Sequence, residues 1–168
     1  MRLLALLLSS GMIISCAGYR MGTVKPTALA GIRTIAVPMM VNETQHPRAE
    51  VIATSALTGA VSQDGTYRIG SMGSADAVLE GRIKSIRYSS IRSVRLDTMR
   101  PAELASTVSI AWVLKDRRDP DRVLASGTSS GTSQLFVDSD LQTARNNALP
   151  DAMERAGVAV VSRLANGF

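Results

Sequence analysis

Side chains that usually carry catalysis or metal binding are scarce in this sequence. The 168 residues include one cysteine, Cys16, and one histidine, His46. A single cysteine excludes an intrachain disulfide and a cysteine-based metal site. The single histidine lies directly before Pro47, where a helix can begin, and is better interpreted as a helix-entry residue than as a general base or zinc ligand. We therefore expect a protein that is not an enzyme and that holds no metal or cofactor.

Aromatic residues are also few, at 4% of the chain. Binding of single-stranded nucleic acid usually needs several aromatic rings on one face for base stacking, so no nucleic-acid partner is expected. Basic residues exceed acidic ones by 19 to 14, which gives a formal net charge of +5. This excess is consistent with contacts to phosphates or carboxylates, and equally with a soluble domain whose surface is basic.

The first apolar run is too short to span a bilayer, which takes about 20 apolar residues. It begins after Arg2 and continues to Ile14, with an interruption at residues 9–11. Ser15 and Cys16 follow. A charge followed by an apolar stretch of this length is typical of a secretory leader. Its end resembles the lipobox of bacterial lipoproteins, in which cleavage occurs just before the cysteine.

We predict that residues 1–15 are a lipoprotein signal peptide and that Cys16 becomes the acylated first residue of the mature chain. Several acyl chains would anchor it stably, since each buried methylene contributes about 0.8 kcal/mol. Ala17, rather than Asp, follows the cysteine. By analogy with the bacterial sorting rule, this favours the periplasmic face of the outer membrane. The alternatives are a cleaved leader with an incidental cysteine and a buried N-terminal helix.

The rest of the sequence predicts a tether and one small domain. Residues 16–31 contain Gly and Pro and show no hydrophobic period, which is typical of an extended tether whose end can dock on the domain. Residues 32–168 are expected to form a single α+β domain with the order β-α-β-β-β-β-α. The economical packing is a mainly antiparallel sheet of four to five strands with two helices on one face.

Strands are expected where β-branched residues gather or apolar and polar residues alternate. The segments are residues 32–37, 66–69, 77–94, 107–115 and 122–137. Apolar positions change parity after Ile83, which predicts a β-bulge near Ser85. Residues 127–133 are rich in Gly, Ser and Thr but lack the lysine of a phosphate-binding loop, so we interpret them as a polar strand.

Two segments carry the apolar spacing of amphipathic helices. The first is expected at residues 47–61, with Pro47 in the first turn, where its missing N–H costs nothing. The second would begin at Ser139, whose side chain caps it, and run to about Ala165. Pro150 should kink this helix or divide it in two.

The candidate binding residues are basic side chains on the central strands. They are Arg82, Lys84, Arg87, Arg92 and Lys115. Arg and Lys presented by a sheet can hold an anionic lipid head group through charge-assisted hydrogen bonds. The alternative is a solvated face whose charges only keep the protein soluble.

Several short segments resemble the LptE family of lipopolysaccharide-assembly lipoproteins. They are residues 16–21 (CAGYRM), 29–38 (LAGIRTIAVP), 42–44 (NET), 47–50 (PRAE) and 75–81 (ADAVLEG). The likeness covers nearly all of the mature chain, although Ala17 is inserted between Cys16 and the Gly18-Tyr19 pair. The family's lipid-contacting residues match no motif in this sequence, so the basic candidates rest on charge and strand position alone.

The resemblance implies a small α+β sandwich anchored in the outer membrane. Family members sit inside the LptD β-barrel as a plug, help to assemble that barrel and bind lipopolysaccharide during its export. An LptD-like barrel and lipopolysaccharide are therefore the expected partners. A periplasm-facing lipoprotein of another secretion or envelope system is the alternative, and a lipid-anchored serine hydrolase is a more distant third.

Overall fold

The computed structural model describes residues 25–93, 101–136 and 141–167, without the side chains of residues 92, 93, 101 and 102. Cys16 and the predicted helix cap Ser139 lie outside this description. The elements are η2 (Thr27–Leu29), β1 (Thr34–Ala36), β2 (Val41–Asn42), α2 (Ala49–Asp64), β3 (Arg68–Ile69), β4 (Ala77–Ser93), β5 (Pro101–Asp116), β6 (Val123–Phe136) and α3 (Leu141–Asn166).

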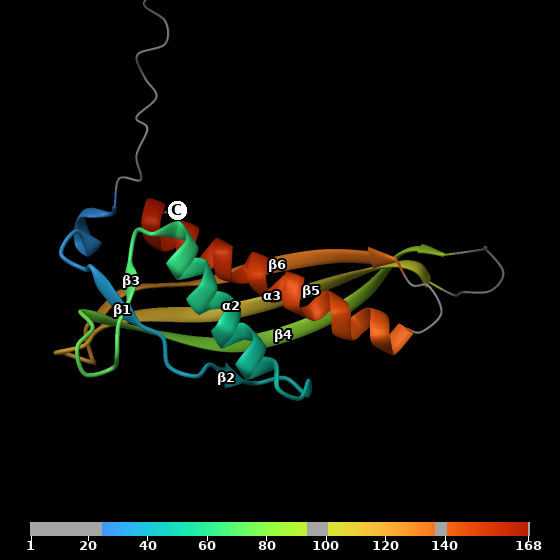
Figure 1. The fold of residues 1–168 in the computed structure, drawn as a ribbon, viewed down its shortest axis with the longest axis horizontal. Helices are drawn as coiled ribbons and strands as arrows, with labels where there is room; N and C mark the ends of the chain where they lie inside the picture. Colours follow the sequence, from blue (N-terminus) through green and yellow to red (C-terminus); the bar gives the residue numbers. More distant parts are fainter. Residues whose placement is uncertain (1–24, 94–100, 137–140, 168) are drawn as a thin grey trace, which may run out of the picture.

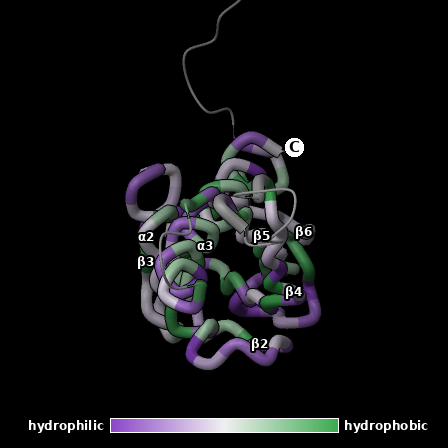
Figure 2. The backbone as a smooth tube through the Cα atoms, turned by 90° about the vertical axis from the view of Figure 1, so that its right-hand side faces the viewer, coloured by the Kyte–Doolittle hydropathy of each residue, from purple (hydrophilic) through white to green (hydrophobic). Residues whose placement is uncertain are grey.

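A single sheet carries both long helices on one side (Figures 1 and 2). Five of its six strands follow the order β3-β1-β4-β5-β6, and the sixth, β2, pairs with β4 beside this path. The predicted α+β class is confirmed. The long strands pair antiparallel, as predicted, but the sheet is mixed rather than purely antiparallel, because β1 runs parallel to β3 and β4, and β2 runs parallel to β4. Strands of two or three residues are too short to show a hydrophobic period, so the sequence did not predict β2.

The three long strands β4, β5 and β6 form an antiparallel meander. On β5, the alternation predicted from the sequence is confirmed, since Val108, Ile110, Trp112 and Leu114 are all buried. The predicted bulge is confirmed as well, because the β4–β5 register shifts between Ile83 and Ser85. Residues 127–133 lie within β6, as expected.

Helix α2 begins at Ala49, two residues later than Pro47. Arg48 precedes it in the left-handed region with φ of 62°, which places Pro47 outside the helix and makes that part of the prediction wrong. At the other end, Gly65 adopts φ of 74° and donates its N–H to the carbonyl of Val61. Glycine takes this conformation without a steric cost and is therefore a common helix terminator.

Helix α3 continues without a break through Pro150, so of the two predicted effects, a kink or a division, the division is wrong and the kink stays a prediction. The proline ring lies on an exposed side, while the adjacent Leu149 and nearby Met153 are buried. Their packing holds the backbone on both sides of the missing hydrogen bond. Neither described helix is both long enough and apolar enough to cross a bilayer.

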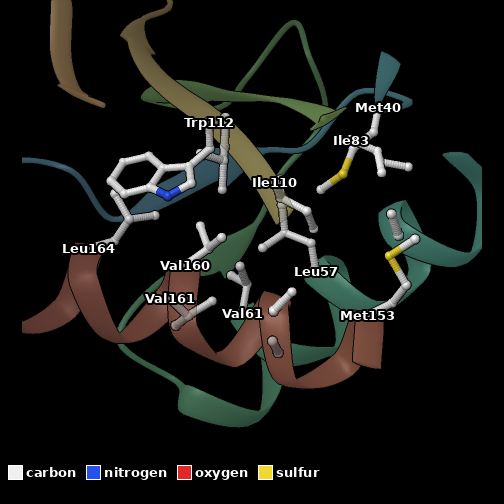
Figure 3. Packing of buried hydrophobic residues seen from close by; sticks show 14 of the residues in the cluster. Met40, Leu57, Val61, Ile83, Ile110, Trp112, Met153, Val160, Val161 and Leu164 are labelled. Carbon is white, nitrogen blue, oxygen red and sulfur yellow. The ribbon is translucent and has the colours of Figure 1, made fainter. Parts of the chain in front are cut away.

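The core fills the space between the sheet and the two helices (Figure 3). Helix α3 lies so close to β6 that a Cβ added to Gly131 would be 2.1 Å from the carbonyl oxygen of Ala152. Leu29 from η2 is only 2% exposed and joins this core. The described end of the segment predicted as a tether therefore packs against the domain.

Candidate functional site

The face of β4, β5 and β6 opposite the helices, here called the outer face, brings most of the predicted basic residues together. Arg82 and Lys84 point outward before the bulge in β4, and both are exposed. Without the bulge, an odd-numbered residue such as Arg87 would point toward the core. The register shift after Ile83 reverses the parity, so that exposed Arg87 joins Arg82 and Lys84 on the outer face.

An acidic residue that the sequence analysis did not select lies between two of these cations. Arg82 Nη1 donates to Glu43 Oε1 at 3.3 Å, and Lys84 Nζ is paired with Glu43 Oε2. The hydrogen bond from Lys84, and then that from Arg82, lowers the pKa of Glu43. Only the parallel pairing of β2 with β4 brings Glu43 to this position, about 40 residues along the chain from its partners, so no local sequence signal marks it.

The other basic candidates differ in their surroundings. Lys115 Nζ lies 2.8 Å from Glu80 Oε2 and is thus paired within the sheet. Among the described residues, Arg87 has no ion-pair partner. Arg92 belongs to β4, but its side chain lies outside the described part of the structure.

A hollow of about 510 Å³ opens on the outer face beside this cluster. Ala111, Val113 and Arg82 line it from the sheet, and Met39 and Val41 line it from the connection around β2. Met39 is 60% exposed and Val41 is 47% exposed. An apolar hollow with a guanidinium at its rim can accommodate a ligand that has both an apolar and an anionic part.

Three further polar contacts have structural roles. The indole of Trp112 donates to Ser129 Oγ at 3.1 Å, and Ser133 Oγ donates to the carbonyl of Ala148 at 2.7 Å. His46 lies shortly before α2, with Nδ1 3.2 Å from the carbonyl oxygen of Pro47. Within the described ranges, no three His, Cys, Asp or Glu side chains are grouped as a metal site would require.

Solved structures share this fold. A hypothetical protein of Chlamydia trachomatis superposes with a TM-score of 0.56 at 8% identity, over 79% of this chain and 95% of that one. A minor lipoprotein of Acinetobacter baumannii gives 0.53 at 6% identity, over 80% and 93%. A Xanthomonas campestris protein gives 0.52 at 15% identity, over 80% and 85%. At these identities the likeness shows the fold alone.

Sequence comparison identifies the family. Comparison with curated proteins found no match. The profile of the LptE family, described as lipopolysaccharide-assembly, matches residues 32–164. That range includes both helices except the last residues of α3, and all six strands. The chain therefore belongs to the LptE family of lipopolysaccharide-assembly proteins.

Proposed function

We propose that this protein is an outer-membrane lipoprotein that plugs an LptD-like β-barrel, helps to assemble it and binds lipopolysaccharide on its way to the cell surface. The match to the LptE family over residues 32–164 is the observation that carries this proposal. The protein acts without catalysis, as a binding and assembly factor. Residues 1–15 serve as the signal peptide, and acylated Cys16 holds the domain at the periplasmic face through the segment that follows it.

Lipopolysaccharide binding is assigned to the outer face. Arg82, Lys84 and Arg87 are exposed there, with Arg92 and Lys115 as further candidates. A phosphate group can bind to guanidinium and ammonium groups through charge-assisted hydrogen bonds. An acyl chain could then lie against Met39, Val41 and Val113, which line the adjacent hollow.

The polar character of β6 supports a role as a plug. The lumen of an outer-membrane barrel is polar. The described strand β6 contains no charged residue, and its outward side chains include several hydroxyl groups and one amide. These residues are Ser126, Thr128, Ser130, Thr132 and Gln134. Such a surface can hydrogen-bond to a polar barrel wall without desolvating a charge.

The partner proposal is tested by affinity purification of the full-length, acylated protein from detergent-extracted membranes. Co-purification of a large outer-membrane β-barrel is the expected result, and Cys16→Ala should reduce its recovery. Recovery of soluble periplasmic proteins alone would overturn the proposal. A secretin-type channel in place of an LptD-like barrel would support the alternative of another envelope system.

Lipopolysaccharide binding needs its own experiment. Combined charge reversal at Arg82, Lys84 and Arg87 should weaken binding to purified lipopolysaccharide by at least about tenfold. A matched control reverses Arg68, Arg155 and Arg163, which are exposed elsewhere and produce the same change in net charge. Equal losses in both variants would contradict a specific site on the outer face.

A further inference from the structure

A second hollow, of about 460 Å³, lies on the helix-bearing side of the sheet. It is bounded by the connection between β2 and α2, by β4 after the bulge, and by the first turns of α3. Its lining includes Thr44, His46, Ile86, Tyr88, Arg145 and Asn146. Since Ile86 and Tyr88 point away from the outer face, this hollow is separate from the cluster of Arg82, Lys84 and Arg87.

Arg145 has no protein partner, among the described residues, that accounts for its charge. Its guanidinium carbon lies 5.3 Å from the centre of the Tyr88 ring. The Nε atom of Arg145 is buried without a hydrogen-bond partner in the described part of the chain, and no described residue is bonded to its terminal nitrogens. These terminal nitrogens are donors, so an acceptor atom entering the hollow would satisfy them.

No carboxylate of the described residues lines the hollow. Within the same ranges, none forms an ion pair with Arg145. The nearby carboxylate of Glu50 accepts a hydrogen bond from Asn42 Nδ2 at 3.1 Å and is not part of the lining. A partly buried cation without a counter-ion is costly, and a bound anion removes that cost.

We propose that this hollow binds a phosphate-type oxyanion, with Arg145 as the principal ligand and Asn146 as a further donor. Arg145 can offer its accessible terminal nitrogens in a fork that matches two phosphate oxygens. A phosphate has more acceptor oxygens than a carboxylate, which suits a forked guanidinium and a neighbouring amide on α3. This site goes beyond the proposed function, because it is a second anion site on the opposite side of the sheet.

The direct test titrates inorganic phosphate into the full-length protein in detergent, by calorimetry and by mapping amide chemical shifts. We expect binding with shifts at Tyr88, Arg145 and Asn146, and a loss of affinity of about tenfold in Arg145→Gln. Arg155→Gln is the matched control, because Arg155 lies on the same helix, is exposed and pairs with Asp151.

A second arm distinguishes the source of the phosphate. Short-chain phosphatidic acid and short-chain phosphatidylcholine are titrated into the same detergent-held protein, so that the acyl anchor contributes equally to both. Binding only of phosphatidic acid assigns the site to a lipid head group, whereas binding of inorganic phosphate assigns it to a small anion. Binding of neither probe, or equal affinity in the wild type and Arg145→Gln, would overturn the proposal.

The test still gives an answer if the variant does not fold, and it distinguishes this site from the lipopolysaccharide site on the outer face. If Arg145→Gln does not fold, the shift map of the wild-type protein decides, and shifts confined to the outer face would refute the site. Charge reversal of Arg82, Lys84 and Arg87 should leave phosphate binding at Arg145 unchanged. Failure of the proposed lipopolysaccharide site and failure of this second site are therefore separable.

Discussion

Thr34 and Asp76 bind each other reciprocally, at the point where β1 and β4 begin. Asp76 Oδ2 accepts hydrogen bonds from the hydroxyl and the backbone N–H of Thr34, both at 2.9 Å. In return, the N–H of Asp76 donates to Thr34 Oγ1 at 3.0 Å. The same carboxylate oxygen also accepts the N–H of Arg33. Asp76 thus holds the short parallel strand β1 against the long meander.

Asp76→Asn should destabilise the fold in a pH-dependent manner. The N–H of Arg33, then the N–H and hydroxyl of Thr34, lower the pKa of Asp76 below its ordinary value of 3.8. A lowered folded-state pKa contributes stability above the unfolded-state pKa, and this contribution is lost as the pH falls through the folded-state pKa. Urea unfolding should show a gap between wild type and variant at about pH 7 that narrows toward about pH 3. An equal gap at both values would contradict this role.

Tyr67→Phe should cost about 1–3 kcal/mol, because it leaves a buried carbonyl without its donor. Tyr67 is 2% exposed, and its hydroxyl donates to the carbonyl of Leu164 at 2.8 Å. Tyr88→Phe is the control, because the hydroxyl of Tyr88 has no hydrogen-bond partner among the described residues and its loss should cost less. Comparable losses in denaturant unfolding would refute the expectation.

The same tyrosine predicts a loss of stability at alkaline pH. Burial, followed by the charge of Asp64, raises the pKa of Tyr67 from 10.0 to about 12. The neutral phenol therefore stabilises the fold fully below pH 10, and this contribution is lost as the pH rises toward about 12. Wild-type stability should fall more steeply across this range than that of Tyr67→Phe. Parallel pH profiles would show that Tyr67 does not titrate in this way.

Gly131→Ala should be strongly destabilising, by about 3 kcal/mol or more, because β6 and α3 would have to separate. The added Cβ would lie 2.1 Å from the oxygen of Ala152 and 2.3 Å from the nitrogen of Ala156. Gly59→Ala in α2 is the control, because a Cβ added there would meet no atom of the described chain within 4 Å. That substitution should gain up to about 1 kcal/mol from helix propensity. Thermal unfolding of the wild type and of both variants measures these changes in stability.

Glu43→Gln should strengthen binding of lipopolysaccharide to the outer face. The change releases Arg82 and Lys84 from their shared carboxylate and raises the local positive charge. We expect a several-fold gain in affinity that decreases with added salt. Asp151→Asn, which releases Arg155 on α3, should leave the affinity unchanged. Unaltered or weaker binding by Glu43→Gln would argue against lipid contact at this cluster.

Local patterns predicted the long elements because each of them repeats over many residues. The alternation along β5 required only that Val108, Ile110 and Trp112 share one face, and the parity change after Ile83 was enough to predict the bulge. The start of α2 was less predictable. The left-handed Arg48 depends on how the preceding turn is held, and Pro47 alone does not reveal it.

The sequence by itself determined the α+β class, the basic series on β4 and the scarcity of cysteine and histidine, since these depend on composition and on short-range period. Only the tertiary structure decided which charges are neutralised and which remain unpaired. Parallel pairing of β2 with β4 brings Glu43 to Arg82 and Lys84, whereas the packing of α3 on the sheet leaves Arg145 over Tyr88. These contacts join residues that are far apart in the sequence, and they form when long loops close and the core packs. No local sequence pattern predicts them.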